Sequence, residues 1–149
     1  MIKPAAHYQR LSAMYQAAPI NDFFLPTLTL SEGEAEISID LSEKLFHAAG
    51  AVHGSVYFKM LDDAAFFAAS SLEFELFMLT TSFTTYLTRP VSSGTMRACG
   101  KVVNRNKSQF IVESVVYDNA QRELGRGSGI FVRSKQRLAN TPGYADTQT

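Results

Sequence analysis

The segment from His47 to Asp63 carries the residue types best suited to chemistry. It places Gly54 at the start of a long apolar stretch and two adjacent carboxylates, Asp62 and Asp63, about two turns into it. Free N–H groups at a helix start can stabilise negative charge that develops on a carbonyl oxygen. A carboxylate inside an apolar helix must be paired, solvated in a cleft or shifted in pKa, and each outcome is common at active sites. The spacing therefore predicts an oxyanion site followed by an acid–base group.

The same residues also have purely structural explanations. Asp62 and Asp63 lie about 100° apart on a helix, so at least one of them can simply face solvent. Backbone hydrogen bonds at a helix start explain His53 as well as general-base catalysis does, and His47 also fits an ordinary loop. His7 lies far from this segment in the sequence and receives no role.

Hydrophobic periodicity predicts the elements that position these residues. The stretch from 53 to about 72 is apolar around most of its girth, which indicates a buried helix. The other predicted elements are a helix over 4–17, extended segments over 23–30 and 35–41, and strands over about 77–87, 95–104, 109–117 and 123–133. One antiparallel sheet wrapped around the buried helix accommodates this order. A ferredoxin-like sandwich would need a second amphipathic helix after residue 73, and the sequence offers none.

Length and composition indicate one domain. The chain has 149 residues, and 46% of them are hydrophobic, which is enough to bury a core. We expect a single domain over 1–138 and a disordered tail over 139–149, where small and polar residues dominate. Lysine plus arginine and aspartate plus glutamate number 14 each, and this zero balance argues against nucleic-acid binding.

Cysteine usage and hydropathy limit the class further. Cys99 is the only cysteine, so the chain can form neither an intrachain disulfide nor a zinc site from cysteine pairs. No stretch approaches the roughly 18–20 apolar residues of a membrane span, and the first residues lack a signal-peptide pattern. The expected compartment is the cytoplasm.

The run from His53 to Asp62 resembles the His-Gly-Gly…Asp signature of hotdog-fold acyl-CoA thioesterases, the phenylacetate-degradation and 4-hydroxybenzoyl-CoA thioesterase superfamily. In that signature the aspartate follows the histidine by nine positions, as it does here. Residues 86–91, Tyr-Leu-Thr-Arg-Pro-Val, are similar to the family's Tyr-Leu-Arg-Pro strand end with one extra residue. The resemblance covers about residues 20–135. It implies an α+β hotdog fold, in which a curved antiparallel sheet wraps around one long central helix.

The resemblance implies a role for each matching residue. Asp62 matches the carboxylate that activates water or attacks the thioester as a nucleophile. Gly54 matches the backbone donor that polarises the thioester carbonyl, and His53 matches the residue that shapes the turn before the helix. In related enzymes a serine or threonine on the next strand positions the water, and the extra residue leaves Thr80 and Thr81 as candidates.

Two positions depart from the signature. Ser55 replaces its second glycine, and serine can cap a helix start or contact substrate. His47 stands where the family often has asparagine or glutamine, and a histidine there adds pH dependence near neutrality. Asp63 lies beside Asp62, but the spacing favours Asp62 as the site residue.

The implied substrate is an acyl-CoA. Coenzyme A belongs to the substrate, and we expect no resident cofactor and no metal. Cations at strand ends are candidates for its phosphates: Arg89, Arg105, Lys107, Arg126 and Arg133. Apolar residues are candidates for an acyl tunnel, although many of them also fit a plain core: Phe58, Met60, Phe66, Phe67, Leu76, Phe77 and Met78.

The resemblance also implies assembly. In related enzymes the aspartate comes from one subunit and the glycine from its partner, so a homodimer is the minimum active unit and a homotetramer is common. Three alternatives to a hydrolase share the scaffold. They are a hotdog dehydratase with His47 or His53 as base, a catalytically inactive acyl-binding relative, and an interaction module that uses the sheet edges.

Overall fold

The computed structural model describes residues 2–146. Its elements in chain order are α1 (Pro4–Ala17), α2 (Asn21–Phe24), β1 (Thr27–Ser31), β2 (Glu34–Asp40), η1 (Glu43–Leu45), α3 (Gly54–Ser70), β3 (Leu76–Leu87), β4 (Thr95–Arg105), β5 (Phe110–Tyr117), β6 (Glu123–Arg137) and η2 (Leu138–Asn140). Within the described residues the strands form a six-stranded sheet in the order β1-β2-β4-β5-β6-β3, and all neighbours are antiparallel. Strands β1 and β3 are its edges.

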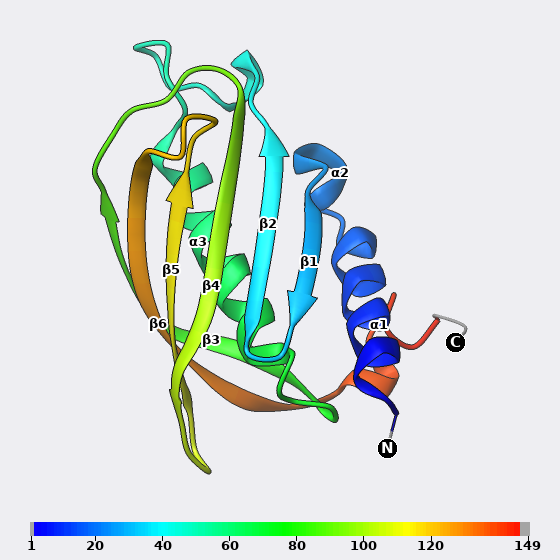
Figure 1. Ribbon diagram of the computed structural model, residues 1–149. Coiled ribbons are helices and arrows are strands. Elements are labelled where there is room, and N and C mark those ends of the chain that lie inside the picture. Colours follow the sequence, from blue (N-terminus) through cyan, green and yellow to red (C-terminus); the bar gives the residue numbers. More distant parts are fainter. Residues whose placement is uncertain (1, 147–149) are drawn as a thin grey trace.

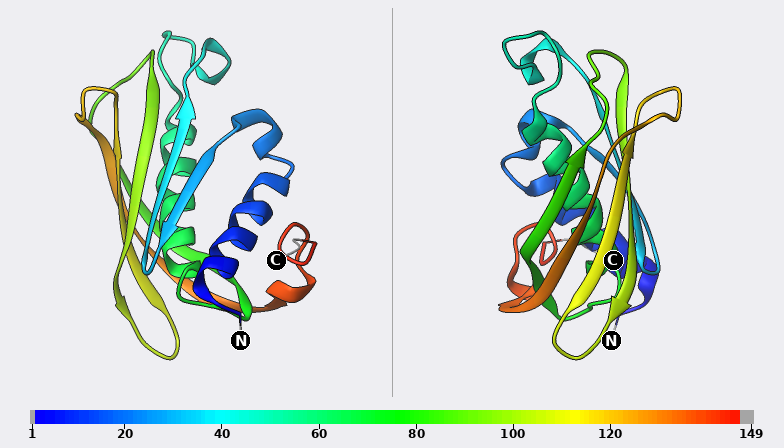
Figure 2. Two further views of the ribbon diagram at one scale, coloured as in Figure 1. Left: turned by 45° about the vertical axis from the view of Figure 1, so that its right-hand side comes forward. Right: turned by 90° about the vertical axis from the view of Figure 1, so that its left-hand side faces the viewer.

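The sheet curves around α3, which lies behind it in Figure 1 and inside its concave face in Figure 2. Helix α3 contacts all six strands. Met60, Leu61, Ala64, Ala65 and Ala68 of this helix are fully buried. The predicted α+β class, with one buried helix wrapped by an antiparallel sheet, is confirmed.

Gly100 of β4 sets how closely α3 approaches the sheet. A Cβ atom added at this position would lie 2.3 Å from the carbonyl oxygen of Ala64, in the backbone of α3. We therefore expect Gly100→Ala to lower the free energy of unfolding by about 3 kcal/mol. The Ala64 carbonyl is part of the helix backbone, so it cannot move aside as a flexible side chain can. Urea unfolding measures this loss. Gly54→Ala is the matched control, since its added Cβ meets only the flexible Leu87 side chain, and an equal loss in both variants would contradict the argument.

The N-terminal region agrees with the sequence in its helix and differs in its first strand. Helix α1 spans the predicted residues 4–17. The predicted extended segment from residue 23 is wrong at its start, because residues 21–24 form the helical turn α2. Leu25 ends this turn in the left-handed conformation, with φ of 50°, and Pro26 follows, so the strand begins at Thr27.

The C-terminal segment differs from the expected disordered tail. Residues 139–146 lie beside α1 (Figure 2), and the Tyr144 side chain is buried. His7 Nε2 donates to the Ser70 carbonyl at 2.8 Å, and Nδ1 then accepts from the Tyr144 hydroxyl at 2.8 Å. Burial lowers the pKa of His7, which keeps the ring neutral for this arrangement. His7 thus joins α1, α3 and the C-terminal segment; residues 147–149 lie outside the described part of the chain.

None of the helices in residues 2–146 combines the length and the apolar character that crossing a membrane requires.

Candidate active site

The start of α3 presents one free backbone donor. His53 adopts non-helical angles, and its Nδ1 accepts the Ser55 N–H at 3.0 Å, so the histidine side chain caps the helix. The His53 carbonyl accepts the Val56 N–H at 3.0 Å. The Gly54 N–H has no acceptor among the described residues. It lies at the positive end of a 17-residue helix, which suits it to stabilise an oxyanion.

Asp62 lies half-buried on α3 opposite the edge strand β3. Its Oδ1 accepts a hydrogen bond from the Thr80 hydroxyl at 2.9 Å. No donor among the described residues reaches its second carboxylate oxygen, which is therefore available to a water molecule. Burial is the largest cause that raises the pKa of Asp62, from 3.8 to about 6, and the neighbouring Asp63 charge adds to it. A carboxylate with this pKa is ionised at neutral pH and basic enough to accept a proton.

Asp63 is engaged in structural contacts. Its Oδ2 accepts from the Tyr15 hydroxyl of α1 at 2.6 Å and from Lys59 Nζ at 2.6 Å. Burial raises the pKa of Tyr15, so the phenol stays protonated and donates. The structure therefore gives the two adjacent carboxylates different surroundings: Asp63 ties α1 to α3, and Asp62 keeps an oxygen free.

A cavity of about 310 Å³ opens beside Asp62 and Thr80. Four of the predicted tunnel residues line it: Phe66, Phe67, Phe77 and Met78. The other three do not. Met60 is buried in the core, Phe58 is 42% exposed, and Leu76 is the first residue of β3, just before the lining residue Phe77. The cavity is thus largely apolar and has the free carboxylate in its wall.

Gly54 and Asp62 are too far apart to act on one bond within a single chain. They are eight positions apart on α3, which corresponds to about 12 Å along the helix axis. A base and an oxyanion donor must each lie about 3 Å from the groups they contact, so they serve one carbonyl only when much closer together. Within one chain, the free donor and the free carboxylate therefore cannot both contact the same thioester carbonyl.

The remaining predicted polar residues, Thr81, His47 and Ser55, have hydrogen-bond partners other than Asp62. Thr81 is not brought to Asp62, because a β-bulge between Thr80 and Ser82 turns its hydroxyl to the Ile130 carbonyl at 3.1 Å. His47 is exposed in the loop before α3, where its Nδ1 accepts the Ala49 N–H at 3.1 Å. Ser55 is exposed at the helix start, with its hydroxyl 2.8 Å from His53 Nδ1.

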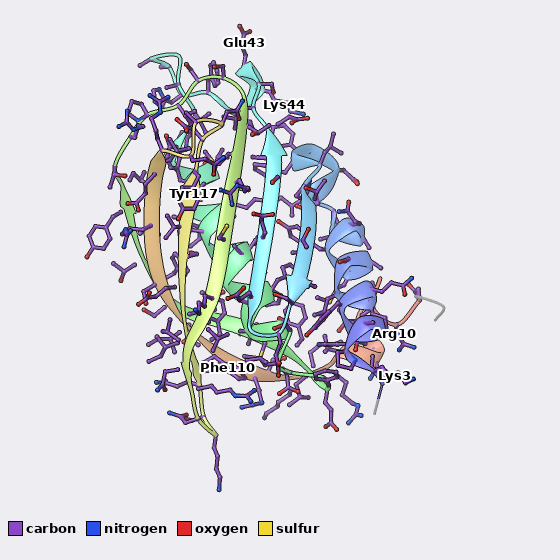
Figure 3. The ribbon with its side chains drawn as sticks, in the orientation of Figure 1. Lys3, Arg10, Glu43, Lys44, Phe110 and Tyr117 are labelled. Atoms are coloured by element: carbon purple, nitrogen blue, oxygen red, sulfur yellow. The ribbon has the colours of Figure 1, made fainter. Side chains whose placement is uncertain are left out.

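The predicted phosphate-binding cations do not form one patch. Arg89 follows β3 near the start of α3, since its carbonyl accepts from Tyr57 of that helix at 2.8 Å. Arg126 is exposed and paired with Glu123. The other three lie toward the far end of the molecule, where Figure 3 shows Phe110, away from Lys44 at the end where α3 begins. There Arg105 of β4 lies opposite Phe110 of the neighbouring strand β5, and Arg133 donates to the Lys107 carbonyl. The part of the chain that the structure describes has no cluster of three or more His, Cys, Asp or Glu residues placed to hold a metal.

Sequence reasoning missed the contribution of the N-terminal helices to the cavity. Met14, Tyr15 and Ala18 of the α1 region line it, together with Ile20 and Asn21 at the start of α2. The apolar stripe of α1 was visible in the sequence, but its packing partner was not. The one local signal was the second carboxylate, Asp63, because a half-buried charge on this helix needs hydrogen-bond partners, and Tyr15 of α1 supplies one of them.

Comparisons with known proteins agree with this architecture. The family model described as "Thioesterase superfamily" matches residues 49–124. The chain is 22% identical over 112 residues to "Putative esterase SSO1253" of Saccharolobus solfataricus, which is 75% of either protein. The PaaI protein from the phenylacetic acid degradation operon of E. coli superposes with a TM-score of 0.82 at 19% identity, covering 90% of this chain and 97% of that one. A thioesterase family protein from Silicibacter pomeroyi gives 0.79 at 20% identity, with 85% and 96% covered.

These likenesses establish the hotdog fold that the sequence predicted. The matched family model covers 76 of the 149 residues, which is just over half of the chain and includes α3, β3, β4 and β5. The chain belongs to the thioesterase superfamily.

Proposed function

We propose that this protein is an acyl-CoA thioesterase in which Asp62 activates the attacking water. The observation that carries the proposal is the Asp62 carboxylate itself. It is held by Thr80, has one free oxygen, and lies in the wall of an apolar cavity. Membership of the thioesterase superfamily supports hydrolysis of acyl thioesters as the reaction class.

The proposed reaction needs only groups of this protein and water. Asp62 takes a proton from water as the water oxygen bonds to the thioester carbonyl carbon, and the carbonyl oxygen becomes an oxyanion. A Gly54 N–H stabilises that oxyanion. The tetrahedral intermediate collapses, the C–S bond breaks, and the proton held by Asp62 passes to the departing thiolate. The products are a carboxylic acid and coenzyme A.

The proposed active unit is a homodimer that pairs two β3 edges. Strand β3 has twelve residues and a free edge. Leu79, Tyr86 and Leu87 are about half exposed along it, and Phe58 of α3 lies exposed beside it. Such an edge is a site for pairing with another strand, and a two-fold axis makes the contact self-complementary. That axis would set two α3 helices side by side and antiparallel, which brings Gly54 of one copy toward Asp62 of the other. A tetramer of two such dimers stays a prediction from the family resemblance.

The dehydratase alternative has less support in the geometry. His53 Nδ1 is occupied as the cap of α3, and His47 lies exposed in the preceding loop. Neither histidine lines the cavity. The phosphate-binding role of Arg89 also stays a proposal. It rests on the position of this arginine near the start of α3.

The proposal is tested by the release of free thiol from a panel of acyl-CoAs. We expect turnover of at least one apolar acyl-CoA by a protein that sedimentation shows to be a dimer or a larger assembly. A native protein without turnover at any chain length would leave the inactive acyl-binding alternative as the better description. A fully active monomer would refute the composite site.

The rate should depend on pH through Asp62. The base must be ionised to accept a proton, and burial raises its pKa to about 6. We expect kcat/KM to be constant above that pH and to fall to about one tenth of its plateau near pH 5. The groups that set this value are Asp63, which raises the pKa, and Thr80 and Lys59, which lower it. A rate that stays constant down to about pH 4.5 in folded protein would show that another group is the base.

A further inference from the structure

The cavity beside Asp62 lies within one chain and is closed on one side by the α1–α2 segment. Residues of that segment face Phe66 and Phe67 of α3 and Phe77 of β3 across it. A substrate whose carbonyl lies at Asp62 can therefore extend its acyl group between α1 and α3. This wall comes from outside the sequence segment that carries the catalytic signature.

The wall is fixed in position by polar contacts. The Tyr15 hydroxyl donates to Asp63 across the gap between α1 and α3, and Lys59 Nζ lies 5.3 Å from the Tyr15 ring centroid. Asn21 is buried, and its Nδ2 donates to the Tyr15 carbonyl at 2.7 Å. The Tyr15–Asp63 contact thus ties the segment to α3, and the Asn21–Tyr15 contact holds the start of α2 to the end of α1, so the side chains of the segment have a defined distance from Asp62.

We propose that residues 14–21 are the specificity-determining wall of the acyl site, and that the site takes uncharged apolar acyl groups of up to about ten non-hydrogen atoms. This inference rests on the proposed function. The size limit follows from the cavity volume of about 310 Å³, because one water-sized group occupies roughly 30 Å³. Ala18 and Ile20 are the lining residues of the segment with the least burial, so substitutions there change the cavity with the least effect on core packing.

The charge of the lining excludes acidic acyl groups. Two carboxylates, Asp62 and Asp63, belong to it. Its one cation among the described lining residues is Lys59, which is 11% exposed and already paired with Asp63 at 2.6 Å. A second carboxylate at the end of an acyl chain would enter the cavity without a partner, and burial of an unpaired charge is costly.

The size limit is tested by Ala18→Phe. Six added ring carbons occupy about 180 Å³, more than half of the cavity. We expect kcat/KM for octanoyl-CoA to fall at least about tenfold, and that for acetyl-CoA to stay within about twofold. Ala5→Phe adds the same ring to an exposed position of α1 and should change neither rate.

A second variant covers the case that Ala18→Phe does not fold. Ile20 is 57% exposed, so Ile20→Ala removes little core packing and widens the cavity at the segment. The ratio of dodecanoyl-CoA to octanoyl-CoA turnover should then rise at least about threefold. If the native protein hydrolyses acyl-CoAs but the chain-length profiles of both folded variants match its own, the wall assignment is wrong and the proposed function stands. If the native protein hydrolyses none, the proposed function itself fails.

The exclusion of acidic acyl groups is tested by comparing two substrates. Hexanedioyl-CoA and hexanoyl-CoA differ by a terminal carboxylate, and we expect the charged substrate to react at least about tenfold more slowly. Equal rates for the two substrates would overturn the exclusion of acidic acyl groups.

Discussion

Asp62→Asn should lower kcat/KM for the best acyl-CoA by about 10²- to 10⁴-fold, the usual contribution of a general base. Asparagine keeps the shape and can still accept from Thr80, but it cannot take a proton from water. The loss should therefore appear in kcat, with KM little changed. Free-thiol release at about pH 8, where Asp62 is ionised, measures both constants.

The neighbouring carboxylate provides the matched control. Asp63→Asn still offers an amide oxygen to Tyr15, but it leaves Lys59 without its ion pair. We expect the rate near pH 8 to stay within about threefold of native. The lost negative charge and the freed Lys59 both lower the pKa of Asp62, so the acid limb of the profile should move to lower pH. A large loss in Asp63→Asn with full activity in Asp62→Asn would transfer the role to Asp63.

Stability separates loss of chemistry from loss of fold in Asp62→Asn. The pKa of Asp62 is higher in the folded protein than the ordinary value of 3.8, so burial of its charge opposes folding above about pH 6. This cost fades as the pH falls toward 3.8, where both folded and unfolded chains carry the proton. Asparagine has no such cost. The variant should therefore unfold at the same or a higher urea concentration than native protein at about pH 8.

The local sequence predicts where α3 begins and which aspartate of α3 we propose as the base. Capping needs only His53 and its next neighbours, and the nine-position spacing to Asp62 is fixed by the helix itself. Both features depend on contacts within one element, which is why short-range rules suffice for them.

The choice between Thr80 and Thr81 depends on a different strand. The bulge that turns Thr81 away from Asp62 is defined by the pairing of β3 with β6, about fifty residues later in the chain. An extra residue in a strand can be absorbed at several places. Its location follows from which side chains fit against the partner strand, and this information is not local.

The wall of the acyl site also depends on contacts between residues that are distant in the sequence. Tyr15 and Asp63 are 48 residues apart, and their hydrogen bond decides which of two adjacent carboxylates is free. The apolar stripe of α1 predicts that the helix is packed, but many surfaces could receive it. The C-terminal segment is a similar case. Tyr144 is held by its hydrogen bond with the distant His7, and not by its polar neighbours in the sequence.

Gly54→Pro should abolish most activity because it removes the backbone N–H donor from the site. Gly54 is the first residue of α3, and its N–H has no acceptor among the described residues. Proline is well tolerated at this position of a helix. His53 already has the extended angles, φ −62° and ψ 141°, that a residue before proline requires. The helix should therefore form without the oxyanion donor, and kcat should fall by about 10²- to 10³-fold.

Gly54→Ala controls for the added Cβ atom. It keeps the N–H, and its Cβ meets only Leu87 Cδ1 at 3.0 Å, the end of a half-exposed side chain. We expect this variant to retain activity within about fivefold. Equal losses in the alanine and proline variants would show that bulk at Gly54, and not the missing donor, causes the effect.

Mixing the two inactive proteins tests whether the site is shared between subunits. In a heterodimer of Asp62→Asn with Gly54→Pro, one site contains both substitutions and the other contains neither, provided that the carboxylate and the donor come from different chains. Random exchange of subunits makes half of the dimers mixed, so about a quarter of native activity should return. If each chain supplied its own pair, every site would keep one substitution and the mixture would stay inactive. The 12 Å that separates the two groups along one α3 predicts the first result.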